Sequence, residues 1–187
     1  MNRKHRHSKQ FHGSPEFLSS PQRLALLEVP RVVTLCLEGV DVRSGLDVGT
    51  GSGVFAQAFA DADLHMVGMD LSWRMLVYAH SQAPHIPLVH GRMEELPFGA
   101  RSFDFIFLGH VLHETDDLIH TMQELHRCAR IRVAALEWPY LDEPMGPPLH
   151  HRLQRHQVKN AAEKAGFLHI EAISLQRMIL YRLTKSL

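Results

Sequence analysis

The chain is poor in cysteine, with only Cys36 and Cys128 among its 187 residues. Both lie in apolar or helical stretches and neither has the spacing of a metal ligand, so no disulfide framework and no cysteine metal site are expected. No apolar run approaches the ~20 residues that cross a bilayer. No apolar signal core follows the basic N-terminus. These absences predict a reduced, cytoplasmic protein without a membrane span.

An excess of charge of one sign is also absent, because 20 Lys and Arg residues balance 20 Asp and Glu residues. This balance argues against a broad nucleic-acid surface. Histidine is plentiful instead, with 15 residues, so the net charge rises as the pH falls toward about 6. The length and the 45% hydrophobic content fit one domain with a full core, which we place at residues 20–187. No pattern indicates an oligomeric state.

Residues 1–19 are expected to form a flexible basic arm. Residues 1–10 carry basic side chains and histidines but no acid, which is typical of a solvated tail. Two sharper interpretations stay open. The arm contacts an anionic partner, or Phe11, His12 and Phe17 fold over a ligand as a lid.

The hydrophobic pattern alternates between strands and helices. Strands are predicted at 44–48, 64–69, 86–89, 102–109, 131–137, 168–175 and 178–183. Helices are predicted at 20–38, broken or kinked at Pro30, and at 54–60, 73–81, 115–128 and 151–165. Ser72 is the expected N-cap of the third helix, and Thr115 or Asp116 that of the fourth. The fold class is α/β, a doubly wound and mostly parallel sheet with an antiparallel edge strand.

The segment Leu46 to Gly53 reads as a strand, a tight glycine turn and the start of a helix. Ligands of such sheets bind beyond the carboxyl ends of the strands, where helix amides face them. Asp70 ends the next strand 21 residues after Gly49, where a carboxylate accepts hydrogen bonds from both hydroxyls of a ribose. Leu71 is placed to pack on an adenine. The alternatives are a plain turn for the glycines and a helix cap for Asp70.

The glycines at 49, 51 and 53 give G-x-G-x-G rather than the dinucleotide pattern G-x-G-x-x-G. This spacing disfavours a nicotinamide oxidoreductase. The chain resembles the S-adenosylmethionine-dependent methyltransferases with a seven-stranded Rossmann-like sheet, in particular the group that includes ubiquinone and menaquinone biosynthesis enzymes. The resemblance rests on Leu46 to Gly53, Gly68 to Ser72 with Met75 and Leu76, His90 to Phe98, Ser102 to Asp104, Val111 to His113, and Ala165 to Phe167.

The resemblance implies a cofactor, S-adenosylmethionine, and a role for each matching residue. The backbone of Gly49 to Gly53 would face its methionine part, with Asp47 near the amino group and Asp70 on the ribose. Arg92, Met93 and Glu94 would border the adenine, and Gly109 and His110 would face the sulfonium. The implied cofactor-binding set is Asp47, Gly49, Thr50, Gly51, Ser52, Gly53, Asp70, Leu71, Met75, Arg92, Met93, Glu94, Gly109 and His110.

Three features depart from the family. Arg92 stands where an acidic residue is usual, so a backbone carbonyl would have to receive the adenine amino group. The helix ending at Cys128 enters the next strand without the usual Pro-Gly-Gly turn. The proline-rich tract 138–150 is short, which predicts a small substrate cap.

The predicted function is methyl transfer to a small-molecule acceptor by in-line displacement, and the alternative is a non-catalytic cofactor-binding or partner module. The cofactor carries the reactivity, and a general base is needed only if the acceptor must lose a proton. His110 and His113 are the candidates, since histidine titrates near neutral pH, with a structural role as the alternative for each. Trp138 and Tyr140 line the acceptor site or anchor the loop. No metal site is expected.

Overall fold

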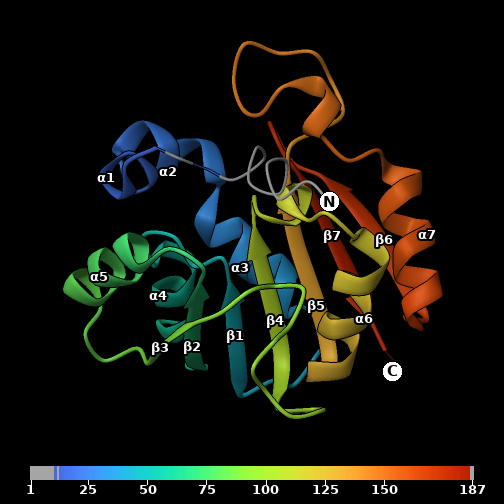
Figure 1. Ribbon diagram of the computed structural model, residues 1–187, viewed down its shortest axis with the longest axis horizontal. Coiled ribbons are helices and arrows are strands. Elements are labelled where there is room, and N and C mark those ends of the chain that lie inside the picture. The colour runs from blue at the N-terminus through green and yellow to red at the C-terminus, as the bar shows by residue number, and fades with distance from the viewer. Residues whose placement is uncertain (1–10, 12, 186–187) are drawn as a thin grey trace, which may run out of the picture.

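The computed structural model describes residues 11 and 13–185; what was expected of residues 1–10 and of His12 lies outside them. In the described part the chain forms one seven-stranded sheet with helices on both faces (Figure 1). The strand order is β3-β2-β1-β4-β5-β7-β6. The strands are β1 Ser44–Val48, β2 His65–Asp70, β3 Leu88–His90, β4 Phe103–Gly109, β5 Ala129–Glu137, β6 His169–Ser174 and β7 Ile179–Thr184.

The sheet confirms the predicted class. The pairs from β3 through β5 are all parallel, whereas β7 runs antiparallel to both of its neighbours. The reversed strand therefore lies one position in from the edge, and the edge pair β7–β6 is antiparallel. The reversed direction of β7 has a local cause, because a short connection around Gln176 and Arg177 joins β6 to β7 and turns the chain back beside β6.

Helices cover both faces of the sheet. They are α1 Pro15–Leu18, α2 Pro21–Leu27, α3 Val29–Leu37, α4 Val54–Ala60, α5 Trp73–Gln82, α6 Leu118–Cys128 and α7 Arg155–Ala165, with 3₁₀ turns at Leu112–Glu114 and Leu149–His151. The buried residues of α3 and α4 share a hydrophobic cluster with Phe105 and Phe107 of β4, whereas those of α6 and α7 share another with Ile106 and Leu108. Neighbouring β4 residues thus face opposite layers, as in a central parallel strand.

Three predicted helix bounds are wrong, and the predicted strand bounds differ from the observed ones by at most two residues. The first helix breaks at Glu28, which has a left-handed φ of 48°, and Pro30 sits in the first turn of α3, where a missing N–H costs nothing. The cap of α6 is Asp117, whose Oδ1 accepts from His120 N. The last helix begins at Arg155, after a separate 3₁₀ turn. The Ser72 cap of α5 is confirmed.

Two sequence expectations concern the chain as a whole. Within residues 11 and 13–185 no helix has the length and apolar character needed to span a membrane. Both cysteines are free and buried, Cys36 against α4 and the sheet and Cys128 at the end of α6. Burial raises the pKa of both thiols, which keeps them protonated and unreactive near neutral pH.

Candidate functional site

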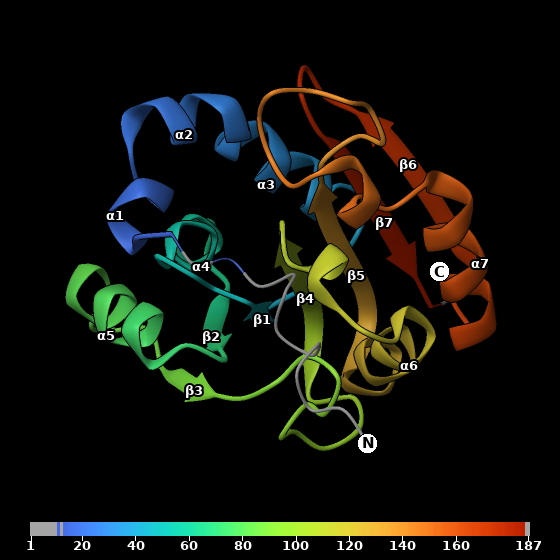
Figure 2. The same cartoon turned by 45° about the horizontal axis from the view of Figure 1, so that its top comes forward.

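A cavity of about 850 Å³ opens at the carboxyl ends of β1, β2 and β4. With the top of the molecule tilted toward the viewer, α1 and α2 lie on one side of these strand ends and the loop 138–150 lies on the other (Figure 2). Sites for small molecules generally measure about 300–1,000 Å³. The sheet therefore carries a ligand-sized cavity at the end where parallel sheets bind their ligands.

The glycine turn forms one wall of this cavity. Gly49, Gly51 and Gly53 all have positive φ, at 69°, 55° and 83°. The amides of Gly49 and Thr50 both donate to the carbonyl of Met69, at 2.7 and 2.9 Å, which ties the turn to β2. Gly53 is the N-cap of α4 and borders neither of the two cavities described here. The turn thus has a fixed shape that L side chains would strain.

Asp47 lies beneath the turn and is buried. Its Oδ2 accepts a 2.8 Å hydrogen bond from the Thr50 hydroxyl. Burial raises the pKa of Asp47 to about 7, against the lowering effect of that hydrogen bond. Asp47, Thr50 and Ser52 border a second, smaller cavity of about 50 Å³ rather than the large one.

Asp70 is the carboxylate that lines the large cavity at the end of β2. Its Oδ2 accepts from Gly51 N at 2.9 Å, and its Oδ1 accepts from Ser72 N at 2.8 Å. Burial raises its pKa, although these amides pull the pKa down. The side chain that caps α5 is that of Ser72, so Asp70 instead holds the glycine turn and the β2–α5 loop together beside the cavity.

The loop after β3 supplies the next wall. Arg92, Met93 and Glu94 line the large cavity, as do Leu71 and Met75 across from them. The Arg92 Nε lies 3.6 Å from Glu94 Oε2. The departure at Arg92 therefore still leaves an acid at this wall, two residues later.

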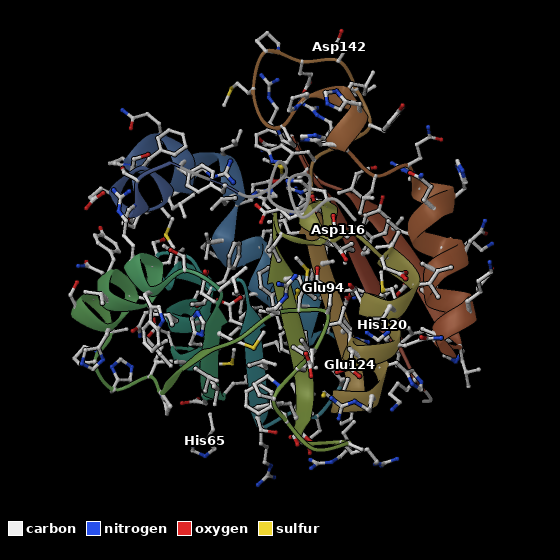
Figure 3. The ribbon with its side chains drawn as sticks, viewed as in Figure 1. His65, Glu94, Asp116, His120, Glu124 and Asp142 are labelled. Atoms are coloured by element: carbon white, nitrogen blue, oxygen red, sulfur yellow. The ribbon has the colours of Figure 1, made fainter. Side chains whose placement is uncertain are left out.

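Figure 3 places Glu94 and Asp116 toward the upper end of the sheet, whereas His65 marks the opposite end. Both acids line the large cavity, and so does Glu114, whose Oε1 accepts from Phe11 N at 3.0 Å. Burial raises the pKa of Glu114 to about 7. The cavity is therefore bordered by several carboxyl groups, a chemistry that favours a cationic ligand.

His110 follows β4 with a left-handed φ of 59°. Its Nδ1 accepts a hydrogen bond from the Arg23 guanidinium, and its Nε2 lies 3.2 Å from Met178 Sδ. Because arginine can only donate, Nδ1 is an acceptor and the ring is neutral. Burial, and after it the Arg23 charge, holds the pKa of His110 well below its usual value. The ring also stacks on Trp138 at 5.2 Å between centroids.

His113 lies in the 3₁₀ turn after β4 and is buried, but it still lines the large cavity. Its Nδ1 lies 2.8 Å from Glu137 Oε2, and its backbone N donates to Glu137 Oε1 at 3.2 Å. The backbone N of Trp138 also donates to Glu137. A carboxylate on Nδ1 fixes the ring orientation and stabilises its protonated form. The two sequence candidates therefore differ, since only His113 has a carboxylate partner.

Sequence reasoning missed Arg23, Glu114 and Glu137 as residues of this site. Glu137 had a usable signal, because it ends a buried strand as Asp70 does. Arg23 had none, because it lies on α2, outside the sheet, and only folding brings it to the strand ends.

The loop 138–150 forms the wall opposite α2. The Arg152 guanidinium holds this loop by donating hydrogen bonds to four of its backbone carbonyls. The acceptors are Pro139 at 3.1 Å, Leu141 at 2.6 Å, Pro147 at 2.9 Å, and Met145. Trp138 lines the cavity beneath this loop and is buried. Tyr140 is exposed and does not border the cavity.

The described part of the predicted arm reaches the cavity. Phe11 and Phe17 line it and stack on each other with centroids 6.4 Å apart. Of the C-terminal histidines, His151 lines the cavity. Among residues 11 and 13–185, no three His, Cys, Asp or Glu side chains gather in a way that could hold a metal ion.

Residues 46–132 match a family model described as a methyltransferase domain. The chain is 36% identical over 112 residues to the demethylmenaquinone methyltransferase of Chlorobaculum tepidum. This match covers 59% of this chain and 45% of that protein. It is 34% identical over 91 residues to the malonyl-[acyl-carrier protein] O-methyltransferase of Legionella pneumophila, covering 46% of this chain and 32% of that one. The chain thus matches less than half the length of these curated relatives.

Solved structures agree on the fold. A SAM-dependent methyltransferase from Aquifex aeolicus superposes with a TM-score of 0.82 at 20% identity, covering 92% of this chain and 97% of that one. A methyltransferase from Mesorhizobium loti gives a TM-score of 0.70 at 16% identity over 84% and 97% of the two chains. At these identities the likeness concerns the fold alone.

Proposed function

Because residues 46–132 match a methyltransferase-domain family, we propose that the chain is an S-adenosylmethionine-dependent enzyme that methylates a small-molecule acceptor. The observation that carries the proposal is the large cavity, which joins the glycine turn, Asp70 and the segment after β4 in one space. The named relatives are methyltransferases, so the alternative of a non-catalytic module is not favoured.

The residues around the cavity fit this cofactor. S-adenosylmethionine carries a sulfonium and an ammonium group, and carboxyl groups of Asp70, Glu94, Glu114 and Asp116 border the large cavity, with Asp47 at the small one. The volume of about 850 Å³ leaves room for an acceptor beside a nucleoside. A nicotinamide dinucleotide carries a pyrophosphate, which these carboxyl groups would repel.

We assign the cofactor contacts to regions of the site. The turn from Gly49 to Gly53 would face the methionine part, Asp70 would hold the ribose, and Leu71 with Met75 and Arg92 to Glu94 would enclose the adenine. Gly109 and His110 would face the sulfonium. When bound, the cofactor supplies a methyl group on a positively charged sulfur. The protein aligns the acceptor with that group and excludes water, and this alignment lowers the free-energy barrier to methyl transfer.

For an acceptor that must lose a proton, we propose His113 as the general base. Its contact with Glu137 stabilises the imidazolium that forms when His113 takes a proton. His110 is less suited, since its Nδ1 already accepts from Arg23 and a neighbouring cation opposes protonation. In this proposal His110 is a wall of the site, and Glu137 is a positioning residue.

The cofactor proposal is tested by calorimetric titration with S-adenosylmethionine and, separately, with NADH. We expect binding of the first alone, and the reverse result would end the assignment. Asp70→Asn should weaken binding by about 1.5–3 kcal/mol, the scale of a hydrogen bond to a charged group. The matched control is Asp41→Asn, which changes an exposed acid away from the cavity.

The enzyme proposal is tested by the release of S-adenosylhomocysteine with a panel of phenols, quinol precursors, carboxylic acids and amines. Release that depends on one acceptor class identifies an enzyme. If tight cofactor binding is accompanied by no release with any class, the binding-module interpretation is the better one.

We also propose a cytoplasmic location, supported by the two free, buried thiols. We retain the division into an arm at residues 1–19 and one catalytic unit at residues 20–187. Cell fractionation checks the first point, and limited proteolysis with mass spectrometry checks the second, with cleavage expected within the arm.

A further inference from the structure

One part of the large cavity has walls without an acid. It lies between α2 and the loop 138–150, which stand on opposite sides of the strand ends (Figure 2). Among the described residues that α2 and the segment 138–151 contribute to the lining, none is Asp or Glu. Their apolar members are Leu26, Trp138, Met145, Pro147 and Pro148. This part of the cavity therefore suits an apolar body rather than a cation.

The indole ring of Trp138 is held in one orientation in this part of the cavity. A Cβ on Gly146, which has a φ of 88°, would lie 2.6 Å from Cδ2 of the indole, so only a glycine fits against the ring there. The His110 ring stacks on the indole with 5.2 Å between centroids. The guanidinium groups of Arg23 and Arg152 lie 5.3 and 5.5 Å from the indole centroid. Because the ring is packed among these groups, the direction of its N–H is fixed.

The indole N–H of Trp138 donates to no group of residues 11 and 13–185, although only 6% of this residue is exposed. No fully buried side-chain nitrogen or oxygen in that part of the chain lacks a partner, so the N–H is accessible rather than sealed in the core. Trp138 borders the large cavity, where an accessible atom of a buried residue can meet a ligand. A largely buried donor of this kind gains free energy when a ligand accepts from it.

Arg23 stands beside the indole, but its charge is partly balanced within the protein. Its guanidinium donates to the His110 ring. The Glu137 charge also acts on Arg23 and favours its protonated form, while burial lowers the pKa of Arg23 to about 10. The charge of Arg23 therefore already has an anion to interact with, whereas the neutral indole N–H has no acceptor among the described residues.

We propose that Trp138 determines the specificity for the acceptor, by donating its indole N–H to a carbonyl or carboxylate oxygen on an otherwise apolar molecule. The inference rests on the proposed function, because it names the acceptor class of the same site. The indole nitrogen can donate but not accept, so it selects an oxygen and disfavours an ammonium group. A site that hydrogen-bonds a substrate group discriminates against analogues that lack it.

The test uses probes that share a naphthalene body and differ in one head group. The ketone 2-acetylnaphthalene and the carboxylate 2-naphthoate offer an oxygen, 2-ethylnaphthalene offers none, and 2-naphthylmethylamine carries an ammonium. Equilibrium dialysis measures the affinity of each probe for protein saturated with S-adenosylhomocysteine. Trp138→Phe keeps an aromatic ring and removes the N–H. The matched control is Trp73→Phe, at the other of the two tryptophans, which is exposed and does not border the cavity.

In wild-type protein we expect the ketone to bind about 5- to 10-fold more tightly than 2-ethylnaphthalene, the scale of one neutral hydrogen bond. The carboxylate should share this advantage, and the ammonium probe should bind most weakly. In Trp138→Phe the advantage of the ketone should fall below about twofold, because the donor is gone. Trp73→Phe should keep the wild-type ratio. Binding of S-adenosylhomocysteine by Trp138→Phe verifies that this variant is folded.

Several results would overturn the assignment. Survival of the ketone's advantage in Trp138→Phe would exclude the indole N–H, and its loss in Arg23→Gln alone would make Arg23 the donor. Equal affinities for the ketone and 2-ethylnaphthalene in wild-type protein, or binding of no probe, would mean that these walls select no oxygen. Failure of the proposed function looks different, because S-adenosylhomocysteine itself would not bind, and dialysis without it would still measure the ratio.

Discussion

At the residue scale, the site contains carboxyl groups that work against the stability of the fold. Asp47 is buried and accepts a hydrogen bond from the Thr50 hydroxyl, and Glu114 is subject to the charges of Glu137 and Asp70. Burial raises the pKa of each to about 7. Such shifts gather where a site is shaped for a ligand rather than for stability. Binding a cationic group would restore their ionised form.

Asp47→Asn tests this cost. The pKa of Asp47 is about 7 in the folded chain against 3.8 as the ordinary value. Between these values the folded state holds a proton that the unfolded state has lost, so stability falls as the pH rises through this window. At about 1.36 kcal/mol per unit, the loss is at most about 4 kcal/mol above pH 7. Because asparagine does not ionise, the stability of the Asp47→Asn variant relative to wild type should rise from pH 4.5 to pH 8.

Urea unfolding at several pH values measures that relative stability. Other titrating groups, Glu114 included, cancel in the comparison of variant with wild type. Asp41→Asn, at an exposed acid, should give a flat difference. A flat difference for Asp47→Asn as well would mean that Asp47 ionises normally. The same variant should bind S-adenosylhomocysteine more weakly, which separates stability from function.

Glu137→Gln tests the positioning role. Glutamine can still accept from the His113 ring, but it removes the charge that stabilises an imidazolium. With the acceptor found in the panel, kcat should fall about 100-fold or more, while cofactor affinity changes little. Glu163→Gln, at an exposed acid on α7 that pairs with Lys159, is the control. An unchanged kcat would remove His113 from proton transfer.

At the scale of elements, the sequence predicts the parts that depend on local pattern. The bounds of β1 and α4 agree with the prediction to the residue, because a glycine turn separates an apolar strand from an apolar helix face. The errors fall where tertiary contacts decide. Glu28 takes a strained φ at the α2–α3 break, where its carboxylate also accepts from Gln176 N, 148 residues away.

The same division applies to the site. Residues at a strand end or in the segment that follows it, such as Asp70 and His113, could be placed from the sequence because parallel strands end at one edge. Arg23 could not, since its position depends on how α2 packs over the turn. The Arg152 hydrogen bonds to the loop 138–150 were equally hidden, because backbone carbonyls leave no mark in a sequence.

The glycine turn offers a prediction with an internal control. Gly49 and Gly39 have nearly the same φ, 69° and 72°, but a Cβ on Gly49 would lie 2.7 Å from Val111 Cγ2, whereas one on Gly39 meets nothing within 4 Å. Gly39→Ala should cost about 1–2 kcal/mol of backbone strain. Gly49→Ala should cost a further 1–3 kcal/mol or so for overpacking.

Chemical denaturation of the two glycine variants gives this difference directly. The double variant Gly49→Ala with Val111→Ala should recover part of the extra cost, since it removes the atoms that the new Cβ meets. Equal costs at the two glycines would mean that the turn shifts freely and that its shape is not fixed by Val111.

At the scale of the whole molecule, the large cavity is lined by residues from Phe11 to His151 of a described chain that ends at Lys185. Its walls come from Phe11 near one end, from the turn at Gly49, from the segment after β4 and from the loop that Arg152 holds. The matched family segment, residues 46–132, contains neither Arg23 nor Glu137. The segments on either side of it therefore complete the site, which makes ligand binding a property of the entire fold.

Ligand-dependent thermal stability checks that conclusion. A ligand that binds only the folded state stabilises it by about 2.7 kcal/mol at 100 times its Kd. For a chain of this size, that corresponds to a rise in Tm of roughly 5–10 °C, at about 2–4 °C per kcal/mol. We expect this rise with S-adenosylhomocysteine and none with NADH, whose pyrophosphate meets the acidic walls. At the same ligand concentration the Tm of Asp70→Asn should rise less. The ligand stabilises the folded variant by about 1.4 kcal/mol less for each tenfold loss of affinity. A larger rise with NADH would contradict both the charge argument and the cofactor assignment, because it would require an anion to be favoured beside the carboxyl groups that line the cavity.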